Sequence, residues 1–313
     1  MGADTAAPLG VFVGLATLDV VHRVASPPRR NEKVTAVRQD VAAGGPAAGA
    51  AVTYAALGGR ARLITALGTG TVAGLVRAEL VERGVEVVDV APGSAVPAPV
   101  SAVQVDVQTG ERAVVSMDAA AHRVEAPADL DELVRGAAVV LVDGHHEALA
   151  AAAARSAAAE RDGRGAPRLL LDAGRWRPVM AELMPLADVV ICSDDFRLPG
   201  VEGSAQTAAG LRDMGVPTVV VSHGGAPVEW WEQGQSGTVE VPVVPVLDTL
   251  GAGDAFHGAY AHAVARGLPT PRAAGAAAAV AAHRVGVVGP RDWLDGLPQV
   301  LGVQVVDAAV GQR

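Results

Sequence analysis

Residues 248–259 read DTLGAGDAFHGA and combine a turn, the start of a helix and an acidic side chain in one short segment. The alanine-rich run that follows, AFHGAYAHAVARG, has the composition of a helix and ends on Gly267. The preceding residues 239–247 are β-branched and interrupted by prolines, which predicts an exposed or edge strand. The glycines therefore mark a helix N-terminus, where free N–H groups and the positive end of the helix dipole can hold an anion.

Asp254 stands beside this expected anion site. A carboxylate there can accept the proton of a hydroxyl group, while the backbone of Gly251, Ala252 and Gly253 stabilises charge on a transferring phosphoryl group. The simpler alternative is that Asp254 only caps the helix and that the glycines form an ordinary turn. Without further information, the segment supports both interpretations.

Length and composition fit one α/β domain spanning residues 1–313, with a small appendage. The formal net charge of −9 argues against a nucleic acid or an anionic membrane as partner. No apolar run approaches the roughly 20 residues of a membrane span, and the N-terminus lacks the pattern of a signal peptide, so we expect a cytoplasmic location. The single cysteine, Cys192, excludes an internal disulfide and a cysteine-based metal cluster.

Strand-like runs alternate with alanine-rich helical stretches along the chain, which predicts a parallel sheet covered by helices on both faces. These runs are LGVFVGLA, ARLITALG, AAVVLVDG, RLLLDAG, DVVICS and TVVVSHG. Several end in Gly, Asp or Ser, where ligand loops collect in open α/β sheets. Residues 21–44 and 99–118 instead alternate polar and apolar side chains, and QTGE supplies a hairpin-type turn. We expect these two segments to form a small antiparallel sheet.

The string DTLGAGDAF closely resembles the C-terminal signature of the ribokinase-like (PfkB) carbohydrate kinases. The similarity extends through GLATLD, AAGGPAAGAAVTYAALGG, VDVQTGER and VVVSHGG, and so covers nearly all of the chain. The resemblance implies a three-layer α/β/α sandwich with a mostly parallel sheet and an antiparallel β lid that covers the sugar and pairs two subunits. It also implies ATP and Mg²⁺ as cofactors, and Asp254 as the catalytic base.

The resemblance points to a group of candidate substrate-binding residues near the N-terminus. Asp19 matches the family's aspartate that binds sugar hydroxyls, although a turn aspartate at a strand end is the alternative. Gly45 opens the next helix and would bring backbone against the substrate. Many relatives have GGN there, and Pro46 cannot replace that asparagine, so the hydroxyl pattern recognised must differ.

The GGPAA variant is most similar to the sulfofructose kinase branch of the family. Lys33, the only lysine, matches a residue that binds the anionic sulfonate there, with a solvated lid residue as the alternative. Two further anion contacts of that branch are replaced here by Ser116 and His145, which we treat as candidate substrate ligands. His146 follows in the same loop, and because nothing distinguishes the two side chains, ordinary loop histidines are the preferred interpretation.

Other matches concern the nucleotide and the metals. Asp194 and Asp195 stand in a degenerate form of the magnesium-linked Asn-x-x-Glu motif that also resembles the ketohexokinase branch, and either could support Mg²⁺ through water. Asp248 is the candidate ligand for a monovalent cation, K⁺, although the shortened loop VGVVGP after the last long helix weakens that site. The residues matched to the nucleotide-binding positions are Ser193, Ser222, Gly224 and His283.

The sequence therefore predicts an ATP-dependent sugar kinase acting on a terminal hydroxyl of a ketose or ketose derivative, including an anionic one. A nucleoside kinase is an alternative, weakened by the few aromatic residues available to stack a second base. A non-catalytic ligand-binding member of the fold is another, motivated by the absent GGN, GDD and Asn-x-x-Glu strings. The Gly-x-Gly-x-x-Gly motif of a nicotinamide dehydrogenase does not follow the first strand, and the P-loop motif is also missing. The sequence therefore supports neither of these enzyme classes.

Overall fold

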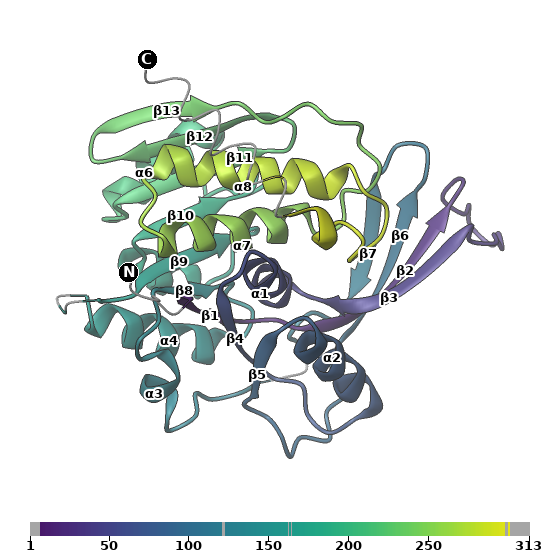
Figure 1. Ribbon diagram of the computed structural model, residues 1–313, viewed down its shortest axis with the longest axis horizontal. Helices are drawn as coiled ribbons and strands as arrows, with labels where there is room; N and C mark the ends of the chain where they lie inside the picture. Colours follow the sequence, from purple (N-terminus) through teal and green to yellow (C-terminus); the bar gives the residue numbers. More distant parts are fainter. Residues whose placement is uncertain (1–6, 121–122, 162, 164, 298–299, 301–313) are drawn as a thin grey trace, which may run out of the picture.

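A nine-stranded sheet forms the centre of the molecule, as the computed structural model shows for residues 7–120, 123–161, 163, 165–297 and 300 (Figure 1). The strand order is β13-β12-β11-β10-β9-β8-β1-β4-β5. The strands from β11 to β5 are parallel, whereas β12 and β13 form an antiparallel hairpin at one edge. The strands are β1 Leu9–Val13, β4 Arg60–Thr65, β5 Val85–Asp89, β8 Val139–Val142, β9 Arg168–Ala173, β10 Val189–Cys192, β11 Thr218–His223, β12 Ala226–Glu232 and β13 Gln235–Val239.

Helices cover both faces of this sheet, which confirms the predicted sandwich. Alternate residues of β8 belong to different cores: Val139 and Leu141 pack with α1, α7 and α8, whereas Val140 and Val142 pack with α4. A strand buried on both faces has to be apolar throughout, as this one is. The helices are α1 Pro46–Ala56, α2 Thr71–Glu82, α3 Leu130–Val134, α4 Glu147–Ala159, α5 Met180–Leu183, α6 Ser204–Asp213, α7 Ala252–Ala265 and α8 Thr270–Val285.

A second, four-stranded sheet projects from the side of the molecule (Figure 1). Its order is β3-β2-β6-β7, with a parallel central pair, β2 and β6, and antiparallel outer pairs. It is built from the two segments that were predicted to form it, residues 21–44 and 99–118, except that its first strand already begins at Thr17. The strands are β2 Thr17–Val24, β3 Arg38–Gly44, β6 Val100–Asp106 and β7 Arg112–Ser116.

The small sheet has two different faces because side chains alternate along each strand. On β2, Asp19, Val21 and Arg23 point to the face that meets the large domain, where Val21 packs with buried valines of β6 against Leu250. On the opposite face, the row that contains Val41 is largely exposed. The small sheet therefore faces the DTLGAGD segment with one side only.

The expected strand at residues 239–247 is wrong beyond its first residue. Strand β13 ends at Val239, and the following residues form no regular structure. Pro242 and Pro245 lack the N–H groups that would pair with a neighbouring strand, and Val243 is fully exposed. The segment instead runs as an extended connection toward the start of α7.

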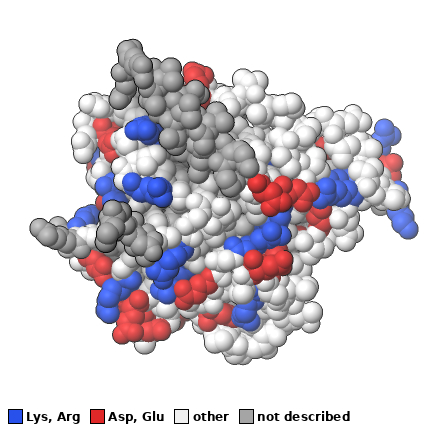
Figure 2. Space-filling view, in the orientation of Figure 1, with Lys and Arg blue, Asp and Glu red and all other residues white. Residues whose placement is uncertain are grey.

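Charged side chains of both signs are distributed over the face of the molecule that Figure 2 shows. On the face in Figure 2, acidic and basic side chains lie next to one another, and the described residues form no continuous basic stretch there. Within the described ranges, no helix is both long enough and apolar enough to cross a membrane. The single cysteine, Cys192, is buried at the end of β10 and forms no disulfide.

Candidate active site

The DTLGAGD segment forms the start of α7, as predicted. Gly251 is the N-cap residue and adopts a left-handed conformation (φ 72°) that favours glycine. Asp254 lies in the first helical turn, and Ala255 N–H donates the first helical hydrogen bond to the Gly251 carbonyl (2.9 Å). Before that bond, the Ala252 N–H makes a long hydrogen bond to the Thr249 carbonyl (3.4 Å). The Gly253 N–H lies at the positive end of the helix, where an anion can bind.

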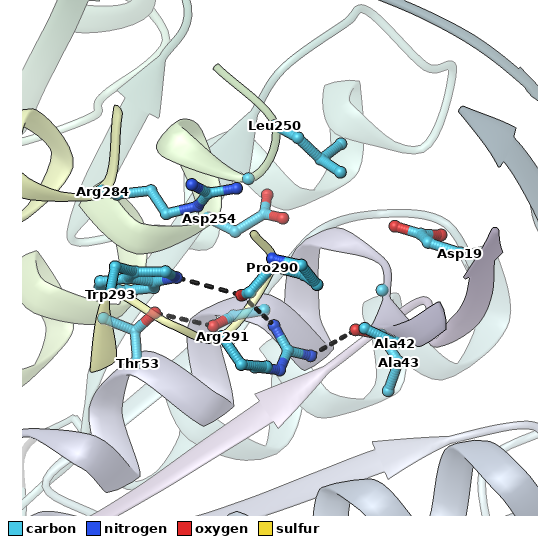
Figure 3. A pocket seen from close by; sticks show the side chains of 13 residues that line it. Asp19, Ala42, Ala43, Thr53, Leu250, Asp254, Arg284, Pro290, Arg291 and Trp293 are labelled. Carbon is cyan, nitrogen blue, oxygen red and sulfur yellow. Dashed lines mark hydrogen bonds between the residues drawn. The ribbon is translucent and has the colours of Figure 1, made fainter. Parts of the chain in front are cut away.

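Asp254 and Asp19 line the same pocket, although they come from opposite ends of the chain. Figure 3 shows the Asp19 carboxylate pointing toward Asp254 across the hollow, with Leu250 on one side and Arg291 on the other. Glycine at the pocket wall leaves the space that the Asp254 side chain occupies. A Cβ atom on Gly49 would lie 2.7 Å from the Asp254 carboxylate.

The carboxylate of Asp254 sits in a negative environment. Burial and the neighbouring carboxylates of Asp172 and Asp19 raise its pKa to about 8. Burial also raises the pKa of Asp19, which accepts a hydrogen bond from Thr17 Oγ1 (2.7 Å). A base with a pKa near neutrality is well matched to accepting a proton from an alcohol.

Ser116 lies on the same face of the small sheet as Asp19. The cross-strand register aligns Asp19 with Ser101 of β6, and Ser101 with Ser116 of β7. The Ser101 hydroxyl donates to the Ser116 hydroxyl (3.2 Å). A row of oxygen atoms therefore runs from Asp19 across the sheet.

One wall of the pocket is held by the segment after α8. Arg291 Nε donates to Glu79 Oε1 (2.7 Å), and its guanidinium also reaches the carbonyl of Ala43 at the end of β3. The Trp293 indole N–H donates to the Pro290 carbonyl (3.1 Å), as Figure 3 shows. The sequence interpretation missed Arg291, because nothing in the local pattern identifies its partners.

His145 does not line this pocket. Its ring lies between the carboxylates of Asp143 (3.1 Å) and Asp118 (2.8 Å), beside the guanidinium of Arg177. Burial opposes a charge on the ring, but the two carboxylates outweigh it and raise the pKa of His145 to about 10. Asp118 follows β7, so this charged cluster attaches the end of the small sheet to the core.

Asp143 is a buried organising residue that the sequence interpretation did not single out. Its carboxylate accepts hydrogen bonds from the N–H groups of Leu15 (2.9 Å), Ala47 (3.2 Å) and His145 (3.0 Å). It thereby fixes the turn after β1 and the start of α1, whose N-cap is Gly45 (φ 96°). The signal available was its place at a strand end, in VVLVDG.

Three of the four candidate nucleotide residues lie at the ends of β10 and β11, and the fourth, His283, lies on α8. Ser193 Oγ donates to the Gly174 carbonyl (2.9 Å), and Ser222 Oγ contacts the Cys192 carbonyl (3.4 Å). Gly224 forms the turn between β11 and β12. His283 is directed back toward the Trp293 carbonyl (2.9 Å).

Asp194 and Asp195 follow β10 and are exposed. Asp194 contacts His223 Nδ1 (2.6 Å), and the other ring nitrogen of His223 contacts Glu229 (3.0 Å). In the described part of the chain, no cluster of three or more His, Cys, Asp or Glu side chains could hold a metal directly. The prediction that Asp194 or Asp195 supports Mg²⁺ through water therefore stays a prediction.

Asp248 does not fit the expected monovalent cation. Its Oδ2 atom accepts hydrogen bonds from Arg23 (2.7 Å) and Arg284 (3.0 Å), and its Oδ1 atom accepts one from the Leu250 N–H (3.0 Å). Both carboxylate oxygens are thus engaged, and the protein itself supplies the positive charge at this position.

Lys33 is separated from the pocket within one protomer. It is exposed in the connection between β2 and β3. The register pairs Asp19 with Ala42 at the pocket end of these strands and Arg23 with Arg38 at the other end, beyond which Lys33 lies. A substrate contact by Lys33 therefore requires this connection to bend, or a second protomer.

Comparisons with known proteins match most of the chain. The model of the pfkB family of carbohydrate kinases matches residues 8–295. A ribokinase of Haemophilus influenzae is 22% identical over 259 residues, which cover 80% of this chain and 84% of that protein.

Two solved structures have the same fold. A candidate ribokinase from Agrobacterium tumefaciens has a TM-score of 0.81 at 26% identity, covering 95% of this chain and 99% of that one. The Arabidopsis thaliana ribokinase complexed with ribose and ATP has a TM-score of 0.76 at 24% identity, with coverage of 95% and 99%.

Proposed function

The chain belongs to the pfkB family of carbohydrate kinases, which are phosphotransferases with alcohol acceptors, and we propose that it transfers the γ-phosphoryl group of ATP to a terminal hydroxyl of a ketose or ketose derivative. The observation that carries this proposal is the shared pocket of Asp254 and Asp19, at the N-terminus of α7. One carboxylate is placed to bind hydroxyls and the other to take a proton beside an anion site.

In the proposed reaction, Asp254 accepts the proton of the acceptor hydroxyl as that oxygen attacks the γ-phosphorus, and the bond from the γ-phosphorus to the bridging oxygen breaks so that ADP leaves. The backbone of Gly251, Ala252 and Gly253 stabilises the charge of the transferring group. Mg²⁺, when bound with the ATP phosphates, supplies further charge neutralisation, and Asp194 and Asp195 are the residues that would hold it through water. Asp19 fixes the sugar so that the reacting hydroxyl meets the base.

The acceptor side supports a sugar more than a nucleoside. The described pocket wall combines carboxylates and glycine backbone with a single aromatic residue, Trp293, whose indole N–H is directed at a carbonyl. A polyol needs such oxygen acceptors, whereas a nucleobase gains from stacking between aromatic rings. The relatives named as ribokinases make an aldopentose the main competitor to a ketose.

The nucleotide is proposed to bind along the ends of β10 and β11, at Ser193, Ser222 and Gly224, with His283 flanking the base. Ligands of open α/β sheets collect at the carboxyl ends of the parallel strands. A nucleotide bound there would extend its phosphates toward the N-terminus of α7. Because ATP is the donor, we also propose a cytoplasmic location.

A homodimer formed through the small sheet is part of the proposal. The face away from the pocket carries a row of small and apolar side chains, Val41, Val20, Ala102 and Val115, aligned by the strand register. Val41 is 52% exposed and Val115 is 76% exposed. Exposed apolar sheet faces of this kind mark association surfaces.

The test is turnover by the purified protein with ATP and Mg²⁺ against ketohexoses, a sulfonated ketose, aldopentoses and nucleosides, followed by ADP release. We expect turnover of a ketose or its derivative, with ³¹P NMR placing the new ester on a terminal carbon. Preference for a nucleoside would establish the alternative kinase. If no acceptor is phosphorylated while sugars still raise the melting temperature, the chain is a non-catalytic binding protein.

A further inference from the structure

A group of four charges, three of them buried and the fourth partly exposed, lies next to the anion site. Asp248 begins the segment that ends in Asp254, and its side chain is fully buried. Arg23 and Arg284, each 2% exposed, both contact its Oδ2 atom. Arg23 also contacts Asp40 (3.1 Å). Two arginines and two aspartates thus neutralise one another, and the arginines keep the pKa of Asp248 below its usual range although burial opposes this.

The Arg284 guanidinium joins two loops in the way that a small cation would. One nitrogen binds the Asp248 carboxylate, and the other donates to the Val287 carbonyl in the loop after α8 (2.9 Å). A bound monovalent cation would use the same kinds of ligand, a carboxylate and a backbone carbonyl. The adjoining backbone is connected as well, because the N–H groups of Leu247 and Asp248 donate to the Val285 carbonyl (2.8 and 3.1 Å).

Arg23 extends this connection to the small sheet. It stands on β2, on the same face as Asp19, and reaches Asp248 across the boundary between the two sheets. The segment that carries the anion site is therefore attached both to α8 and to the strand that carries the proposed sugar ligand. Adding K⁺ to this group would leave one positive charge unbalanced in a buried place, which is costly.

We propose that the guanidinium of Arg284, supported by Arg23, is a built-in replacement for a monovalent cation, so that this kinase works without K⁺ and Arg284 acts as a positioning residue for residues 251–254. The inference rests on the proposed kinase function. The natural chain should be independent of K⁺, whereas a variant that lacks the guanidinium should respond to K⁺.

For the natural chain, turnover and melting temperature are measured in KCl and in tetramethylammonium chloride at equal ionic strength. We expect kcat and the melting temperature to be the same in both salts. A severalfold activation by K⁺, or a melting temperature that rises with K⁺ alone, would overturn the inference.

For the variant, Arg284→Ala removes the guanidinium and leaves Asp248 with Arg23 alone. We expect kcat to fall about a hundredfold, because the anion site loses its fixed position. K⁺ or added guanidinium ion should restore much of it, and K⁺ should raise the melting temperature of this variant only. Arg284→Lys, which keeps a charge, should lose less and gain nothing from K⁺.

Arg38→Ala is the matched control, because Arg38 also contacts Asp40 but is exposed and does not touch Asp248. A folded Arg284→Ala variant that neither K⁺ nor guanidinium affects would contradict the positioning role. If no protein sample phosphorylates any acceptor, the proposed function fails, whereas the melting temperatures in the two salts still decide the inference about the cation.

Discussion

The two sides of the pocket are built on different principles. The α7 side rests on a sheet that is buried on both faces, and its anion site is fixed by a left-handed glycine and by the buried Asp248. The other side is a four-stranded sheet with one exposed face, which meets the large domain through a small cluster of valines and through ion pairs of Arg23 and Asp118. In the proposed reaction, the α7 side carries the phosphoryl transfer, and the thinner side carries Asp19, which is proposed to bind the acceptor.

The largest effect is expected on the α7 side, from Asp254→Asn. The amide cannot accept the hydroxyl proton, so kcat should fall by about 10²–10⁴-fold. In the natural chain, kcat/KM should rise with pH, reach half of its maximum near pH 8, where half of the carboxylates have lost their proton, and level off at higher pH.

Stability provides the control for this variant. The folded pKa of Asp254 is raised above the unfolded value, so its contribution to stability is fully present at low pH and is lost as the pH rises toward 8. The Asn variant should therefore melt at a higher temperature than the natural chain above pH 8. A variant that is inactive because it is unfolded would contradict this account.

Crowding the same side should have the next largest effect. In Gly49→Ala, the new methyl group would press on the Asp254 carboxylate at 2.7 Å, and we expect kcat to fall about a hundredfold through misplacement of the base. Gly74→Ala is the matched control, since a Cβ there meets no atom within 4 Å. The control should keep full activity and gain about 0.5–1 kcal/mol in stability. Equal losses in the two variants would show that Asp254 is not held where we describe it.

These two sides also differ in how far the sequence could predict them. The start of α7, its glycine cap and the two-sided burial of β8 follow from local pattern alone. The partners of Asp248 do not, because Arg23 is 225 positions away and only tertiary packing brings it there. The same reason explains why Arg291 was missed.

One sequence expectation failed because local composition competes with the wider packing. Residues 240–247 have the β-branched composition of a strand, but their prolines cannot donate the hydrogen bonds of a sheet. For His145, the sequence left open a substrate ligand or an ordinary loop histidine, and it could not show that two carboxylates and Arg177 surround the ring in the fold.

On the thinner side, Asp19→Asn should act on binding more than on chemistry. Losing charged hydrogen bonds to the sugar costs about 1.5–3 kcal/mol, so KM should rise about 10–100-fold while kcat changes less. Ser116→Ala, in the same cross-strand row, should change KM by less than Asp19→Asn. Steady-state kinetics on the preferred acceptor make the comparison. A fall in kcat with unchanged KM would give Asp19 a role in the transfer step.

The exposed face of the small sheet gives the next test. Val115→Asp would place two unpaired carboxylates in the proposed dimer contact, so the dissociation constant should rise at least about tenfold, as measured by sedimentation. Val243→Asp is the matched control, because Val243 is fully exposed in the extended connection and outside this sheet. A monomeric natural chain, or equal behaviour of the two variants, would remove the lid dimer from the proposal.

The smallest effect is expected in the connection between β2 and β3, at the end of the small sheet away from the pocket. Lys33 is exposed, and exposed charge contacts contribute at most about 1 kcal/mol, so Lys33→Ala should raise KM no more than about fivefold. The rise should appear only for an anionic ketose derivative and should shrink as salt is added, because salt screens exposed charges. Arg30→Ala, in the same connection, serves as control for general loss of positive charge. If neutral and anionic acceptors respond alike, Lys33 is a solvated lid residue, and the acceptor is selected within the pocket around Asp19.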